Sequence, residues 1–179
     1  KYFVFVGAFN PRKNLVRLLQ AYDFFKKETQ SDIKLVIVGD EMYGTSKMMH
    51  ALNEMSFRDD VVFTGRLQVD QLRKVVGSAF AMTYVSYYEG FGIPLLEAMK
   101  CDIPIVASNC TSIPEVARNA AIYVDPFNVG AIKDGMVRIY NDEELRKQLV
   151  LNARKQSEMF SWDKTAQSLY LCMMKAIAK

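Results

Sequence analysis

Short apolar runs alternate along the whole chain with longer segments of helical periodicity, and this alternation is the feature that most limits the possible folds. The runs are bounded by Gly, Asp or Pro and occupy residues 2–6, 34–38, 61–64, 81–85, 104–107 and 121–124. Continuously apolar strands separated by helices are typical of βαβ units with both sheet faces covered. The pattern predicts an α/β fold: a doubly wound, Rossmann-like domain with about six parallel strands and helices on both faces.

Apolar residues at helical spacing mark the connecting segments. Leu15, Leu18, Leu19, Tyr22 and Phe25 share one face of a helix predicted over residues 14–28. The other predicted helices span residues 46–55, 69–78, 93–100, 129–140 and 142–160. Ser161 can cap a C-terminal helical tail over residues 162–178. We therefore expect residues 1–160 to form one ligand-binding domain and residues 161–179 to form a helix beyond it.

The composition excludes several classes of protein. With 23 basic and 20 acidic residues the net charge is only +3, so no nucleic-acid partner is predicted. Three cysteines without CxxC spacing argue against a disulfide framework and a zinc site, and favour a cytoplasmic location and no metal. No apolar run reaches the roughly 20 residues of a membrane-spanning helix. The chain starts inside a predicted strand without Met, which we interpret as a piece of a longer polypeptide.

The loop after the first strand carries a glycine and two adjacent basic residues. Ligands of such sheets bind beyond the carboxyl ends of the strands, so Gly7, Arg12 and Lys13 are candidates for binding an anion at a helix N-terminus. Arg can hold two phosphate oxygens and Lys adds a point charge. The alternative is a solvated basic pair. Because GxGxxG is missing, a dinucleotide-dependent oxidoreductase is disfavoured.

The loop after the fourth strand reads EGFGIP. Gly90 and Gly92 allow backbone conformations that are closed to other residues, and Pro94 fits the first turn of a helix. The amides of Phe91, Gly92 and Ile93 are then predicted to face a phosphate or sugar oxygen.

Two carboxylates, Glu89 and Glu97, flank this turn eight positions apart. They could accept hydrogen bonds from the hydroxyls of a sugar and of a ribose on either side of a diphosphate. The alternatives are a helix-entry acid for Glu89 and an exposed helical residue for Glu97. An exposed position for Glu97 is disfavoured, because we expect Glu97 to lie on a largely buried helix, where a carboxylate needs a partner or a ligand. A two-carboxylate hydrolase would leave Arg12 and Lys13 without a role.

Three other segments are weaker candidates. Arg66 and Leu67, after the third strand, could lie along a flat base, or Arg66 is a plain surface residue. Asp40 is predicted to cap a loop, and hydroxyls within residues 108–115 either touch the ligand or cap a turn. The only histidine, His50, is interpreted as a surface residue.

These loops, in this order, resemble the C-terminal domain of retaining glycosyltransferases of family 4, group 1, which have the GT-B architecture. Glu89 and Glu97 match the family's Glu, seven residues, Glu motif, with EGFG and EAM intact. The runs at residues 11–14 (PRKN) and 104–126 are also similar, and residues 111–126 of the second run look closest to mannosyl-transferring members. The resemblance covers essentially the whole chain.

The resemblance implies a role for each matched residue. Glu89, Arg12 and Lys13 would form the catalytic set, with both cations near the donor diphosphate and Glu89 on the transferred sugar. Donor-binding residues would be Gly7, Arg66, Leu67, Gly90, Phe91, Gly92, Ile93 and Glu97, the last on the ribose. Many members carry Arg where this chain has Ala8. Either Arg12 would then supply part of the binding to the diphosphate, or the affinity for the donor would be lower.

The implied function is the donor-binding half of a retaining glycosyltransferase that uses a GDP- or UDP-linked sugar and no other cofactor. The acceptor, a glycan or lipid-linked glycan, would bind a missing N-terminal domain on which residues 161–179 could pack. Peripheral membrane association of the full-length protein is compatible with such an acceptor. The alternative is a non-catalytic nucleotide-sugar-binding module on the same fold.

Overall fold

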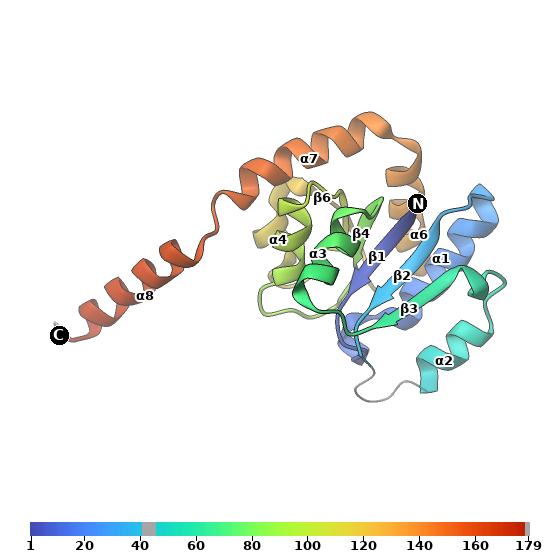
Figure 1. Cartoon of the computed structure of the whole chain (residues 1–179), viewed down its shortest axis with the longest axis horizontal. Coiled ribbons are helices and arrows are strands. Elements are labelled where there is room, and N and C mark those ends of the chain that lie inside the picture. Colours follow the sequence, from blue (N-terminus) through green and yellow to red (C-terminus); the bar gives the residue numbers. More distant parts are fainter. Residues whose placement is uncertain (41–45, 178–179) are drawn as a thin grey trace.

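In the computed structural model, which describes residues 1–40 and 46–177, the chain forms a parallel six-stranded sheet covered by helices on both faces (Figure 1). The sheet order is β3-β2-β1-β4-β5-β6. The predicted α/β fold is therefore confirmed. The strands are β1 (Tyr2–Val6), β2 (Lys34–Val38), β3 (Val61–Gly65), β4 (Ala81–Tyr84), β5 (Ile105–Ser108) and β6 (Ala121–Val124).

Alternate residues of the central strand β1 face the two halves of the core. Phe3 and Phe5 pack with α1 (Leu15–Thr29), α2 (Ser46–Asn53) and α6 (Val129–Asn141). Val4 points to the other face, which is covered by α3 (Val69–Gly77), α4 (Ile93–Lys100) and α5 (Ile113–Ala117). Burial on both sides explains why the strands read as continuous apolar runs.

The helix α7 (Glu143–Ser157) lies at the edge between these two layers. Its Leu149 belongs to the core cluster on the α1 side, and its Ala153 belongs to the cluster on the α4 side. Asp142 caps α7 by accepting a hydrogen bond from the amide of Leu145 at 2.8 Å. The helix ends at Ser157, three residues earlier than the periodicity predicts.

The last helix, α8 (Trp162–Ile177), projects away from the body of the chain (Figure 1). Ser161 caps it as predicted, through a bond from the amide of Lys164 to the Ser161 hydroxyl. All of its described residues are exposed, among them the large side chains Trp162, Leu169, Tyr170, Leu171, Met173, Met174 and Ile177. Among the described residues, none of the helices is both long and apolar enough to span a bilayer.

Candidate functional site

The direction of winding reverses between β1 and β4, which are hydrogen-bonded neighbours although three connections separate them in the sequence. At such a switch point the loops that follow the two strands part and leave a crevice for ligands. The amide of Tyr87, after β4, donates to the carbonyl of Arg12, after β1, at 3.0 Å. The two segments that carry the predicted catalytic residues therefore meet at this point.

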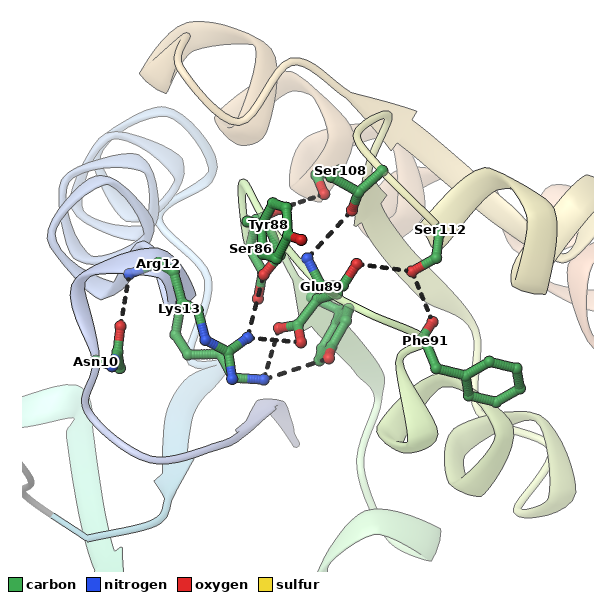
Figure 2. A network of polar contacts seen from close by, with 11 residues as sticks. Asn10, Arg12, Lys13, Ser86, Tyr88, Glu89, Phe91, Ser108 and Ser112 are labelled. Atoms are coloured by element: carbon green, nitrogen blue, oxygen red, sulfur yellow. Dashed lines mark hydrogen bonds and ion pairs between the residues drawn. The ribbon is translucent and has the colours of Figure 1, made fainter.

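Glu89 forms ion pairs with both basic residues of the first loop (Figure 2). Its Oε1 lies 2.6 Å from Nζ of Lys13, and its Oε2 lies 2.7 Å from Nη1 of Arg12. Arg12 also donates to the carbonyl of Tyr88 at 3.1 Å. Glu89 is 8% exposed and Lys13 is 7% exposed. A solvated basic pair is therefore wrong for Lys13, and Glu89 is a buried partner of two cations rather than a simple helix-entry acid.

The charge of Glu89 is stabilised despite its burial. Burial acts to raise the pKa of Glu89, but hydrogen bonds from Lys13 and Arg12 bring that pKa below its ordinary value. Glu89 is thus ionised at neutral pH and accepts hydrogen bonds. Charge-assisted bonds of this kind hold a carboxylate in a defined orientation.

The first loop has its own structural anchor, which sequence reasoning missed. Pro11–Lys13 form a short 3-10 helix that ends at Asn14, whose φ of 63° is left-handed. The buried Asn14 amide donates to the carbonyls of Val85 at 3.0 Å and Pro126 at 2.7 Å. Asparagine tolerates left-handed φ, and its position directly after PRK was the available signal. Asn14 therefore ties the loop after β1 to the ends of β4 and β6.

The EGFG turn presents backbone donors beside Glu89. Gly92, at φ 105° and ψ 52°, caps the N-terminus of α4, where Pro94 occupies the first turn as predicted. Within the described part of the chain, the amides of Phe91, Gly92 and Ile93 donate to no protein acceptor. Unpaired amides at a helix N-terminus favour an anion.

Hydroxyls from the loop after β5 fix the backbone of this turn. Thr111 Oγ1 accepts a hydrogen bond from the amide of Glu89 at 3.1 Å. The Ser112 hydroxyl lies 3.0 Å from the carbonyl of Glu89 and 3.1 Å from that of Phe91, and donates to them (Figure 2). Both hydroxyls hold the Glu89 segment, which agrees with the turn-capping interpretation.

Glu97 differs from what we expected. The buried side of α4 consists of Leu95, Ala98 and Met99, whereas Glu97 and Ile93 are exposed. The premise that the Glu97 carboxylate lies on a largely buried face is wrong, because the helix is amphipathic with Glu97 on its outer side. Partial burial still raises the pKa of Glu97.

Residues directly after β2 and β3 contact each other at the same edge of the sheet. Asp40 Oδ1 accepts a hydrogen bond from the amide of Arg66 at 2.9 Å, so Asp40 caps a loop as predicted. A Cβ on Gly39 would lie 2.1 Å from the carbonyl oxygen of Gly7, so only glycine permits this approach. Arg66 is exposed, Leu67 is half-buried, and neither they nor Gly7 join the hydrogen bonds around Glu89 in the described residues.

In residues 1–40 and 46–177, no cluster of three His, Cys, Asp or Glu side chains could hold a metal ion. His50 is exposed on α2, so it is a surface residue as interpreted from the sequence.

The sequence profile of the family described as Glycosyl transferases group 1 matches residues 1–156, most of the chain. The chain belongs to this family. O-antigen chain mannosyltransferase B of Escherichia coli is 32% identical over 162 residues, which cover 90% of this chain and 42% of the relative. The chain therefore spans less than half the length of this curated relative.

Solved structures share the fold. The sucrose-phosphate synthase of Thermosynechococcus elongatus superposes with a TM-score of 0.86 at 24% identity, covering 99% of this chain and 45% of its own. The C-terminal domain of a group 1 glycosyl transferase, LpcC of Francisella tularensis, superposes with a TM-score of 0.77 at 18% identity. That match covers 88% of this chain and 84% of the solved domain. The Rossmann-like assignment agrees with both.

Proposed function

We propose that the chain is the donor-binding half of a retaining glycosyltransferase, which moves a sugar from a nucleoside diphosphate to an acceptor hydroxyl. The observation that carries the proposal is the buried Glu89 held between Arg12 and Lys13, beside three amides that have no acceptor among the described residues. The cluster offers cations and N–H donors to a diphosphate and a carboxylate to sugar hydroxyls. Membership of the group 1 family supports the same reaction class.

Transfer breaks the bond between the anomeric carbon and a diphosphate oxygen and forms a bond to the acceptor oxygen, whose proton passes to the departing diphosphate. Negative charge develops on the departing diphosphate. Preorganised cations and backbone N–H groups stabilise such charge most when they need no rearrangement. Arg12, Lys13 and the amides of residues 91–93 would supply this stabilisation, so we propose that no cofactor is required.

The other predicted residues complete the proposed donor site. Glu97, exposed on the outer side of α4, would bind the ribose hydroxyls, and Gly7 would allow the diphosphate to approach the first loop. Arg66 and Leu67 would lie beside the base. Several relatives are named mannosyltransferases, so a mannosyl donor is the first to test.

The acceptor would bind a further domain of a longer polypeptide, because the chain spans 42% of the mannosyltransferase relative. The exposed apolar face of α8 would pack on that domain. We therefore expect the chain alone to bind donor without appreciable transfer. The alternative, a non-catalytic nucleotide-sugar-binding module, predicts the same binding but no transfer by the full-length protein.

Calorimetric titration of the chain with GDP, UDP, GDP-mannose and UDP-glucose tests the proposal. We expect one nucleotide family to bind, with weaker binding by Arg12→Ala and Glu97→Ala and no change on addition of EDTA. Arg58→Ala and Glu54→Ala are matched controls, because both side chains are exposed on the α2 side of the chain. Absence of binding by all four compounds would overturn the proposal.

A further inference from the structure

Two buried hydroxyls lie against the Glu89 cluster, and the proposed function does not use them. Tyr84, at the end of β4, is 1% exposed, and Nζ of Lys13 donates to its hydroxyl oxygen at 3.3 Å. The same ammonium lies 5.1 Å from the centroid of the Tyr84 ring. Ser86 is fully buried, and its Oγ has no hydrogen-bond partner in the described residues. A buried hydroxyl without a partner is uncommon and calls for an explanation.

Both hydroxyls are near the carboxylate. The Lys13 ammonium links the Tyr84 hydroxyl oxygen, at 3.3 Å, to Oε1 of Glu89, at 2.6 Å, and the unpartnered hydroxyl of Ser86 belongs to the same loop, three residues before Glu89. Burial is the main cause that raises the pKa of Tyr84, and the negative charge of Glu89 raises that pKa further. Tyr84 is therefore a neutral phenol whose oxygen accepts from Lys13 and whose proton remains available to an acceptor.

A bound diphosphate changes the balance around Glu89. In the structure, the carboxylate relies on Lys13 and Arg12, which the proposed function also assigns to the diphosphate. When the phosphate oxygens compete for these cations, a carboxylate that is 8% exposed loses part of its stabilisation. A buried charge in that position needs other hydrogen-bond donors.

We propose that the hydroxyls of Tyr84 and Ser86 hold the Glu89 carboxylate in place when a donor diphosphate competes for Lys13 and Arg12. This inference rests on the proposed function. Tyr84 and Ser86 act through Glu89, so they are positioning residues and touch no substrate. The Ser86 carbonyl is already fixed by the hydroxyl of Ser108 at 2.5 Å, which keeps the Ser86 backbone in register with β5 (Figure 2).

The test compares affinities for a nucleoside diphosphate and for its sugar conjugate, GDP with GDP-mannose and UDP with UDP-glucose. The affinity for the sugar conjugate divided by the affinity for the nucleoside diphosphate isolates the contribution of the sugar, which Glu89 is proposed to bind. Tyr84→Phe and Ser86→Ala should each lower that ratio about tenfold, as expected for hydrogen bonds to a charged group. Affinity for the nucleoside diphosphate itself should change less than about twofold.

The chain contains a matched control for each variant. Among the described residues, Ser31 is the other buried serine whose hydroxyl has no partner, and Tyr22 is a fully buried tyrosine whose hydroxyl donates to the carbonyl of Ile33 at 2.8 Å. Ser31→Ala and Tyr22→Phe should leave the ratio unchanged, even where the thermal midpoint falls. A loss of stability without a change in the ratio is the signature of a merely structural role.

A pH titration supplies a second readout. Removal of either hydroxyl should raise the pKa of Glu89, so the contribution of the sugar should be lost at a higher pH than in the unaltered chain. An unchanged ratio and pH profile, with diphosphate binding intact, would overturn this inference alone. If the unaltered chain bound no nucleotide, the proposed function would fall and this inference with it.

Discussion

Two buried lysines, Lys26 at one end of α1 and Lys13 just before the other, pair with carboxylates in opposite electrostatic settings. Lys26, in the last turn, pairs with Asp60 at 2.7 Å and donates to the carbonyls of Ser31 and Ile33. A helix C-terminus favours a cation. The carboxylate of Asp60 and the two carbonyls thus stabilise the charge of Lys26 within the protein. The ion pair also connects α1 to the segment before β3.

Lys13 lies just before the other end of α1, where the helix dipole disfavours a cation and attracts an anion. In the part of the chain that the structure describes, its charge is balanced by one carboxylate, that of Glu89, which is shared with the half-exposed Arg12. Two cations around one carboxylate leave an excess of positive charge beside three amides without acceptors. The two lysines are both buried but differ in charge balance, and this difference is the basis on which we propose a binding role for Lys13 and not for Lys26.

Binding should separate the two lysines most strongly. We expect Lys13→Met to weaken binding of the nucleoside diphosphate by about a hundredfold, because it removes a charge-assisted donor from the proposed phosphate site. Lys26→Met should change the affinity by less than about twofold, once corrected for the folded fraction. Calorimetric titration gives both values. Equal losses in the two variants would mean that Lys13 has no special role in binding.

Stability should show the reverse order. Lys26→Met should lower the free energy of unfolding by about 2–3 kcal/mol, since the ion pair is broken and two buried carbonyls lose their donor. Lys13→Met should cost about 1 kcal/mol, because Arg12 still pairs with Glu89. Urea denaturation measures both values. A larger loss for Lys13→Met would show that the Glu89 cluster is chiefly structural.

The fold was predictable from the sequence because strands covered on both faces read as unbroken apolar runs, and all six were found. The meeting of Arg12 and Lys13 with Glu89 follows from the switch-point rule, and EGFG marks the turn. Burial of individual side chains was less predictable. Periodicity does not show which side of an eight-residue helix faces out, so Glu97 was placed wrongly. The anchoring bonds of Asn14 span up to 112 positions in sequence and leave no local pattern.

The pH dependence of unfolding tests the electrostatic argument for Glu89. Because its folded pKa lies below the ordinary value of 4.5, its ion pairs stabilise the fold above pH 4.5, and this stabilisation is lost as pH falls through the lower folded value. Over about two pH units, from about pH 5 to about pH 3, the free energy of unfolding of the unaltered chain should therefore fall more than that of Glu89→Gln. Parallel curves would show that Glu89 gains no net stabilisation from Lys13 and Arg12.

The smallest expected effect concerns Glu97, the carboxylate whose pKa is shifted in the opposite direction from that of Glu89. Its folded pKa is raised by partial burial, so the ionised group disfavours the fold above that pKa, and the penalty disappears below the unfolded value of 4.5. Glu97→Gln should raise stability at pH 7, by less than about 0.5 kcal/mol because the group is exposed. The same variant should weaken nucleotide binding, whereas Glu54→Gln should change neither.

A group that costs stability and improves binding is retained for its ligand rather than for the fold. If Glu97→Gln instead destabilised the chain at pH 7, or bound nucleotide as tightly as the unaltered chain, Glu97 would be an ordinary surface residue of α4. Glu89 would then be the only one of the two motif carboxylates with a role in the site. The proposed ribose contact would have to come from elsewhere in the crevice, and the exposed Arg66 beside Asp40 is the first residue to examine.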